Sequence, residues 1–265
     1  MISKDCEQMI KKISVFFSSV IILLLSGCAT KNPLTDFQFQ TVTAIPYIVA
    51  SWYKIEAPTE DIRIYIEGDG HSFDAYNNPT DNPTPHSTFI RSLAANDPNP
   101  NVVYLARPCQ YLQTSACSQE DWTCGRFSQN IVDSMEASIL SLAKKARAQK
   151  ITLIGYSGGA QVAGLVAVKN PERIKKVITI AGVLDQEAWT KYHGDTPLYQ
   201  SLNLKDYQDT FNQIPQKHFI GEKDTVVPNQ LTYEFVANPE QVVLVKKADH
   251  QNGFEKIYRD IYQDN

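Results

Sequence analysis

Residues 151–160 read ITLIGYSGGA and contain the pattern Gly-x-Ser-x-Gly at Gly155, Ser157 and Gly159. A short, mostly apolar run precedes the pattern, and small and apolar residues follow it. Two glycines around a serine let a strand and a helix approach each other closely, with the serine on a strained turn between them. The stretch therefore predicts a strand, a sharp turn that presents the serine, and a helix over 160–168. The alternative is a glycine-rich turn with a solvent-facing serine.

Strands and helices alternate along the rest of the chain. Apolar or alternating runs predict strands at 51–56, 62–66, 102–106, 151–154, 176–181, 217–220 and 242–245. Helical spacing predicts helices at 89–95, 128–150, 160–168, 229–237 and 253–262. Most of the strands read as continuous apolar runs, which is typical of a parallel sheet covered on both faces. We therefore expect an α/β fold, with one domain over 51–265, a mostly parallel central sheet, helices on both faces and a short cap insert at about 183–216.

A serine hydroxyl is a poor nucleophile at neutral pH, so it needs a base, and the base needs an orienting carboxylate. His250 lies in a loop after the strand at 242–245 and ahead of the final helix. His218 opens an apolar strand, where a structural role is expected. The other histidines lie earlier in the chain or far from the expected position: His71, His86 and His193. The chain order serine, acid, histidine makes His250 the candidate base.

The candidate acid is Asp224, in the loop after the strand at 217–220. Because the carboxyl ends of parallel strands meet at one edge of a sheet, this carboxylate should emerge at the same edge as Ser157. Two other carboxylates, Glu222 and Asp249, compete for the role, and Asp249 is expected to be a solvated neighbour of the base. The loop position favours Asp224.

An acyl-transfer site also needs N–H donors for the oxyanion. The backbone N–H of Gly158, directly after the serine, is the first expected donor. The second is expected from Asp69 or Gly70, in the Glu-Gly-Asp-Gly turn at 67–70 that ends an early strand. Glycines at this turn let the main chain approach the reacting centre. The alternative is an Asp-Gly turn with no catalytic role.

Together these residues resemble the α/β-hydrolase superfamily from about residue 62 to the C-terminus. A narrower likeness is to a group of uncharacterised bacterial α/β hydrolases, many of them predicted lipoproteins. It is carried by IEGDG at 66–70, ARPCQ at 106–110, WT at 122–123, RF at 126–127 and AGVLD at 181–185. The resemblance implies a triad of Ser157, Asp224 and His250 that cleaves an ester or related acyl bond of a small molecule through an acyl-enzyme. Val183 and Cys124 depart from the group's pattern. The group commonly has Asn at the position of Val183, and Cys124 is an extra thiol.

Two functions of other classes are compatible with the same fold. A non-catalytic envelope lipoprotein would use the fold as a binding module, since fold alone does not fix function. The intact serine, acid and histidine and both elbow glycines argue against that interpretation. A serine peptidase would need activity on amide substrates.

The cysteines fall into two groups. Cys6 and Cys28 lie near the N-terminus, while Cys109, Cys117 and Cys124 lie within one short stretch. Exported proteins can keep disulfides, and three thiols allow one bridge and one leftover. The resemblance implies a bridge between Cys109 and Cys117, with Cys117 to Cys124 as the alternative. A metal site is disfavoured because no histidine lies at ligand spacing, and no metal or other cofactor is expected.

Substrate contacts are expected at the same edge of the sheet. Arg107 ends the strand at 102–106, where it either meets an anionic substrate group or, in the commoner role, forms a structural ion pair. The short cap carries aromatic side chains that either line an acyl pocket or cover the sheet edge. They are Trp189, Tyr192, Tyr199, Tyr207 and Phe211.

The N-terminal residues have the pattern of an export signal. Lys4, Lys11 and Lys12 precede an apolar run at 13–25 that is too short to span a bilayer well as a helix. The run closes with Leu-Ser-Gly-Cys at 25–28.

This closing sequence resembles the lipobox of bacterial lipoproteins, in which the cysteine is acylated and the chain is cut just before it. The resemblance implies a lipoprotein signal peptide at 1–27, and a lipidated Cys28 with a tether over 28–50. It further implies an exported protein of the cell envelope, held at the outer membrane if the source is Gram-negative. The alternative is an ordinary cleaved signal peptide, since small residues before a cleavage site are common to both types.

The composition excludes several other classes. Hydrophobic residues make up 43% and charged residues 20% of the 265 residues, which excludes a disordered or coiled-coil protein. The formal net charge is −4, and it becomes −5 once three lysines and two acidic residues of 1–27 are removed. This acidic balance gives no indication of a nucleic-acid partner.

Overall fold

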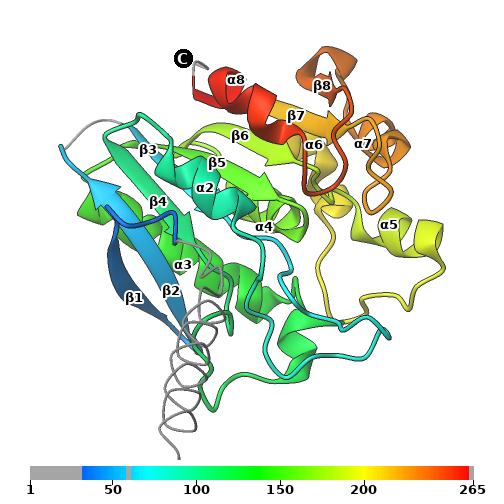
Figure 1. The fold of residues 1–265 in the computed structure, drawn as a ribbon, viewed down its shortest axis with the longest axis horizontal. Helices are drawn as coiled ribbons and strands as arrows, with labels where there is room; N and C mark the ends of the chain where they lie inside the picture. The colour runs from blue at the N-terminus through cyan, green and yellow to red at the C-terminus, as the bar shows by residue number, and fades with distance from the viewer. Residues whose placement is uncertain (1–31, 58–60, 263–265) are drawn as a thin grey trace, which may run out of the picture. The chain divides into compact units, whose positions relative to one another are not determined.

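An eight-stranded sheet forms the centre of the computed structural model, which describes residues 32–57 and 61–262 (Figure 1). The strands are β1 (Gln38–Ala44), β2 (Tyr47–Ile55), β3 (Asp61–Ile66), β4 (Asn101–Leu105), β5 (Lys150–Tyr156), β6 (Ile174–Ile180), β7 (Gln216–Gly221) and β8 (Val242–Val245). Their order in the sheet is β1-β2-β4-β3-β5-β6-β7-β8. β1 pairs with β2, and β2 with β4, in antiparallel fashion, whereas all pairs from β4 to β8 are parallel. The sheet is therefore mostly parallel, as the sequence predicts.

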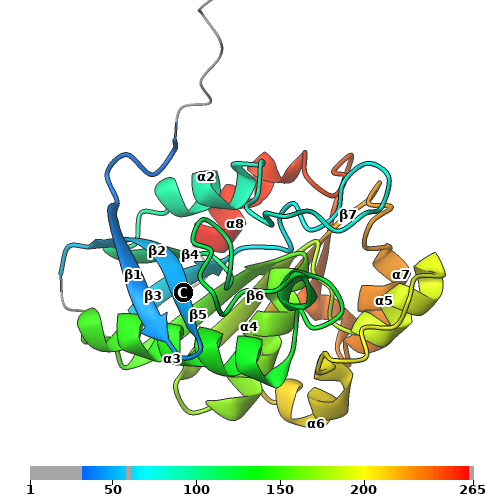
Figure 2. The ribbon, with the colours of Figure 1, turned by 90° about the horizontal axis from the view of Figure 1, so that it is seen from below.

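Helices cover both faces of the sheet (Figure 2). The α-helices of the described residues are α2 (Phe89–Ala95), α3 (Gln129–Lys145), α4 (Gly158–Lys169), α5 (Gln186–His193), α6 (Gln208–Phe211), α7 (Asn229–Phe235) and α8 (Tyr258–Tyr262). Helices α3 and α4 pack on one face, and α2 and α8 on the other. A hydrophobic core lies on each face of the sheet, and alternate residues of β3 point into one or the other. Ile62 and Ile64 pack in the core with α3 and α4, and Tyr65 packs in the core with α2 and α8. Burial on both faces explains the apolar runs of the central strands.

The segment at 28–50, expected to be a tether, proves to be partly folded. β1 and the start of β2 lie within it and form an antiparallel hairpin. Only Val42 and Ala44 of β1 are buried, and Ser134 of α3 donates a hydrogen bond to the carbonyl oxygen of Ala44 at 2.9 Å. An edge strand with two buried side chains has too weak an alternation to be recognised from sequence. The folded domain therefore begins before residue 51.

Two further boundaries follow from local chemistry. Ser128 caps α3 by accepting a hydrogen bond from the N–H of Ile131 at 3.4 Å. The helix ends at Lys145 rather than at 150, because Lys150 already belongs to β5. The expected cap at 183–216 is a short insert that holds α5, α6 and a 3₁₀ helix at Leu204–Tyr207.

No helix within residues 32–57 and 61–262 is long and apolar enough to cross a membrane. The predicted signal segment and Cys28 lie outside the described residues.

Candidate active site

Ser157 lies on the turn between β5 and α4, as the sequence predicts. Its φ angle is 51°, in the left-handed region that residues other than glycine rarely adopt. A Cβ on Gly155 would lie 2.5 Å from the carbonyl oxygen of Gly159, and a Cβ on Gly159 would lie 2.5 Å from that of Glu67. Both glycines are therefore required for the close approach of α4 to β5 and to the end of β3. The turn presents the serine at the carboxyl edge of the sheet.

Ser157, His250 and Asp224 form a continuous chain of hydrogen bonds. His250 Nε2 lies 3.1 Å from Ser157 Oγ, and His250 Nδ1 lies 2.9 Å from Asp224 Oδ2. Because a carboxylate only accepts, the neutral imidazole carries its proton on Nδ1, and Nε2 is left to accept from the serine hydroxyl. The other oxygen of Asp224 accepts from the N–H groups of Val226 and Val227 at 2.9 and 2.8 Å. The carboxylate is fully buried and held in one orientation.

The other carboxylates and the other histidine considered for the roles of acid and base form hydrogen bonds with other groups. Glu222 accepts from the N–H of Lys247 at 2.8 Å. Asp249 accepts from the N–H groups of two residues of its own turn, and these bonds lower its pKa. His218 is buried between Thr179 and Gln216, with both ring nitrogens at 2.8 Å from a partner. Desolvation lowers the pKa of His218 to about 3, so it stays neutral in the structural role that the sequence predicts.

The turn after β3 lies against the nucleophile. A Cβ on Gly68 would lie 3.2 Å from the Cβ of Ser157. Gly158 is the first residue of α4, so its N–H is among those that a helix leaves without an intrahelical acceptor. Among the described residues, none accepts a hydrogen bond from the N–H of Asp69 or Gly70. The predicted oxyanion donors therefore lie near Ser157 and are available, and their catalytic role stays a prediction.

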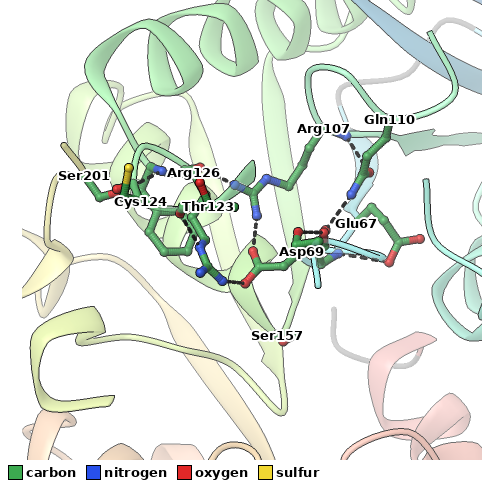
Figure 3. A network of polar contacts seen from close by, with 12 residues as sticks. Glu67, Asp69, Arg107, Gln110, Thr123, Cys124, Arg126, Ser157 and Ser201 are labelled. Atoms are coloured by element: carbon green, nitrogen blue, oxygen red, sulfur yellow. Dashed lines mark hydrogen bonds and ion pairs between the residues drawn. The ribbon is translucent and has the colours of Figure 1, made fainter. Parts of the chain in front are cut away.

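Ion pairs of the Asp69 side chain with two arginines hold this turn in place (Figure 3). Asp69 Oδ2 accepts from Arg126 at 2.7 Å and Asp69 Oδ1 from Arg107. Burial alone would raise the pKa of Asp69, but the charges of Arg126 and Arg107 outweigh it and the pKa is lowered. Gln110 adds a hydrogen bond to the carbonyl oxygen of Gly68 at 2.9 Å. The turn is thus held by three side chains from two other parts of the chain, the loop that contains Arg107 and Gln110 and the segment that contains Arg126.

Glu67, directly after β3, is a further buried carboxyl group, and no pattern in the sequence indicates its role. Its two oxygens accept from the N–H of Gly68 at 2.9 Å and from the hydroxyl of Tyr104 at 2.7 Å. Tyr104 in turn lies 3.1 Å from the hydroxyl of Tyr111. Burial raises the pKa of Glu67 to about 7, because desolvation outweighs these hydrogen bonds. The group therefore titrates near neutral pH.

The cysteines near the site have the pairing that the resemblance implies. Cys109 and Cys117 form a disulfide, and Cys124 is free. The bridge closes the loop that begins directly after Arg107. Arg107 itself is 4% exposed and donates to Asp69 and to the carbonyl oxygen of Arg126. The ion pair with Asp69 is the structural role that the sequence favours for Arg107, rather than a contact with an anionic substrate group.

A cavity of about 630 Å³ opens over Ser157 and His250. Trp189 of α5 lines it, as expected, and donates from Nε1 to the carbonyl oxygen of Val226 at 2.7 Å. Tyr192 is not among the lining residues. Two histidines that the sequence analysis does not assign to the site also line the cavity. They are His71 and His86.

Within residues 32–57 and 61–262, no three His, Cys, Asp or Glu side chains gather in a way that would hold a metal ion.

Comparison with known proteins gives the family. A family model described as serine hydrolase (FSH1) matches residues 57–253, which is more than half of the chain. A search of curated proteins finds no match.

Several solved structures are similar. Est1E from Butyrivibrio proteoclasticus has a TM-score of 0.62 and 12% identity, over 85% of this chain and 96% of that one. The esterase Pf2001 from Pyrococcus furiosus has a TM-score of 0.59 and 15% identity, over 89% and 93%. XC6422 from Xanthomonas campestris, described as an α/β serine hydrolase without lid, has a TM-score of 0.52 and 15% identity, over 86% and 91%. These likenesses show an α/β-hydrolase fold. With the family match, they establish that the chain belongs to the FSH1 family of serine hydrolases.

Proposed function

We propose that the protein hydrolyses carboxylic esters of small molecules through an acyl-enzyme on Ser157. One observation carries the proposal: the hydrogen-bond chain from Ser157 through His250 to the buried Asp224, on the strained turn of a serine hydrolase fold. Three residues far apart in the sequence meet in the order and geometry that acyl transfer requires.

The mechanism follows from these contacts. His250 takes the proton of Ser157 as the hydroxyl attacks the ester carbonyl, and Asp224 stabilises the imidazolium that forms. The negative charge on the carbonyl oxygen is held by the N–H of Gly158 and one from the turn at Asp69 or Gly70. The imidazolium then gives its proton to the leaving alcohol. A water molecule, deprotonated by His250, then attacks the acyl carbonyl, and the bond to Ser157 Oγ breaks as the imidazolium returns the proton to that oxygen.

The test is the variant Ser157→Ala. A fluorophosphonate probe reacts with an activated serine, so we expect wild-type protein to be labelled and to hydrolyse p-nitrophenyl butyrate. The variant should show neither, while its thermal unfolding stays close to that of the wild type. Labelling of the variant at the wild-type rate would refute the assignment of Ser157. Cleavage of amide substrates with no ester hydrolysis would point instead to a peptidase.

We also propose that Cys28 carries a lipid anchor and that the protein belongs to the cell envelope, at the outer membrane in a Gram-negative host. Support comes from the Leu-Ser-Gly-Cys sequence at 25–28 behind a charged and apolar signal segment. The disulfide between Cys109 and Cys117 is consistent with an exported protein, since such bonds persist in oxidising compartments.

A further inference from the structure

His71 and His86 form a pair on the wall of the active-site cavity. Their ring centroids are 4.3 Å apart, with an angle of 31° between the planes. The two residues lie on the long connection between β3 and α2, which folds back so that they meet. Both line the cavity that contains Ser157 and His250, and neither belongs to the proposed triad.

The ring nitrogens of this pair have no hydrogen-bond partner among the described residues, unlike those of the other histidines. Both nitrogens of His250 and both of His218 are bonded, and His193 contacts the carbonyl oxygen of Val226 at 2.9 Å. His71 is half-buried and His86 is exposed at the cavity mouth. The pair thus brings imidazole nitrogens without a hydrogen-bond partner among the described residues to the wall of the cavity over Ser157.

The carboxylates near the pair are already engaged. Both oxygens of Glu67 accept from Gly68 and Tyr104, and those of Asp69 are taken by two arginines. Asp74, whose pKa is lowered chiefly by hydrogen bonds from Asn78, also interacts electrostatically with His71.

Two other ionisable groups line the cavity: His250, which is bonded to Asp224, and Tyr156, whose pKa is raised by burial. Asp249, next to His250 in the sequence, accepts hydrogen bonds within its own turn. A protonated imidazole of the pair therefore has no carboxylate on the cavity wall that is not already bonded to other groups.

We propose that His71 and His86 bind a carboxylate on the substrate, so that the enzyme prefers esters with a second, anionic end. The proposal rests on the proposed function, because it names the substrate class of the same site. Two protonated rings this close repel each other, and an anion bound by both offsets that repulsion. Hydrogen bonds from a charged imidazole are also stronger than those from a neutral one. Because imidazole side chains gain positive charge as the pH falls, preference for the anionic ester should be larger at pH 6 than at pH 8.

The test compares two esters of equal chain length, the p-nitrophenyl monoester of glutarate and p-nitrophenyl pentanoate. The measured quantity is the ratio of their kcat/KM values, in which the titration of His250 cancels because it affects both esters. For the wild type we expect the ratio to rise about tenfold from pH 8 to pH 6, the effect of one charge-assisted hydrogen bond. The double variant His71→Gln with His86→Gln should lower the ratio at pH 6 about tenfold and lose most of the rise. Any rise that remains in the variant measures Glu67, whose raised pKa lies in this range.

The matched control is His193→Gln, a histidine of the cap that does not line the cavity, and it should leave the ratio as in the wild type. A ratio that does not change with pH, or that the double variant leaves intact, would overturn the proposal. Equal losses on both esters would do the same, because they would show a general role in packing.

A binding measurement separates this proposal from the proposed function. In the Ser157→Ala variant, proton NMR follows the titration of the two imidazoles with and without monomethyl glutarate. We expect the ester to raise the pKa of at least one ring, even if no ester proves to be hydrolysed by the wild type. Unchanged titration curves at saturating ester would refute the anion site whatever the enzyme's reaction.

Discussion

Glu67 is a titrating group in the lining of the active-site cavity, and its ionisation should weaken the fold. Burial raises its pKa from 4.5 to about 7, a shift that corresponds to about 3 kcal/mol between the two protonation states. An acid whose pKa is raised in the folded state does not lower the free energy of unfolding at a pH below its unfolded pKa, because it is protonated in both states. The cost grows as the pH rises and is complete above the folded pKa.

The variant Glu67→Gln isolates this effect, because its amide is uncharged, its oxygen can still accept from the N–H of Gly68, and its NH₂ group can donate to the hydroxyl oxygen of Tyr104. We expect the wild-type free energy of unfolding to fall between pH 4.5 and pH 8 by about 3 kcal/mol more than that of the variant. Guanidinium denaturation at several pH values measures both curves. Parallel curves for the two proteins would show that the carboxyl group is not buried in this way.

Asp69 acts on the reaction through the backbone that it holds. Asp69→Asn removes the charge that pairs with Arg107 and Arg126 and loosens the turn that carries an expected oxyanion donor. Since loss of one donor costs about a hundredfold or more in kcat, we expect a fall of about ten- to a hundredfold in kcat for p-nitrophenyl butyrate with little change in KM. Steady-state kinetics measures kcat and KM separately. A rise in KM at constant kcat would instead indicate a direct contact between Asp69 and the substrate.

At the scale of elements, the contact between α4 and the end of β3 decides whether the elbow forms. A Cβ on Gly159 would lie 2.5 Å from the carbonyl oxygen of Glu67 and 2.6 Å from that of Ile66, and neither backbone atom can move aside cheaply. Gly159→Ala should therefore lower the stability by about 1–3 kcal/mol and abolish most fluorophosphonate labelling.

Gly164→Ala, one and a half turns further along α4, is the matched control. Its Cβ would meet only the side chain of Leu204, so it should reduce stability while leaving labelling of Ser157 near the wild-type rate. Equal labelling in both variants would show that the elbow tolerates a wider spacing from β3.

The elements that the sequence predicts best are those whose signal is local. The elbow at 155–159 and the helix cap at Ser128 are encoded within a few residues, and the structure has both. β1 was missed because its burial depends on α3, which lies far along the chain. The pairing of His71 with His86 depends on how a long loop closes, and the loop's sequence has no period that indicates it.

At the scale of the whole domain, parallel topology explains why three distant loops form one site. Ser157 follows β5, Asp224 follows β7 and His250 follows β8, and the order β5-β6-β7-β8 brings these carboxyl ends to one edge. The chain order could therefore be used to select Asp224 and His250 before the structure was known. The raised pKa of Glu67 could not be predicted, because it arises from burial in the folded domain, which outweighs the hydrogen bond from Tyr104, 37 residues away in the sequence.

The last prediction concerns attachment of the whole molecule to a membrane. Attachment through a lipidated Cys28 would depend on acyl chains, each buried CH₂ contributing about 0.8 kcal/mol. In a bacterial host, wild-type protein should incorporate an alkyne-labelled fatty acid and migrate as a chain shortened by its signal segment. Cys28→Ala should remain unlabelled and uncut, whereas Cys124→Ala, which removes the free thiol of the folded domain, should be labelled like the wild type. Label retained in Cys28→Ala would place the lipid on another residue, and unlabelled but shortened wild-type protein would indicate an ordinary cleaved signal peptide.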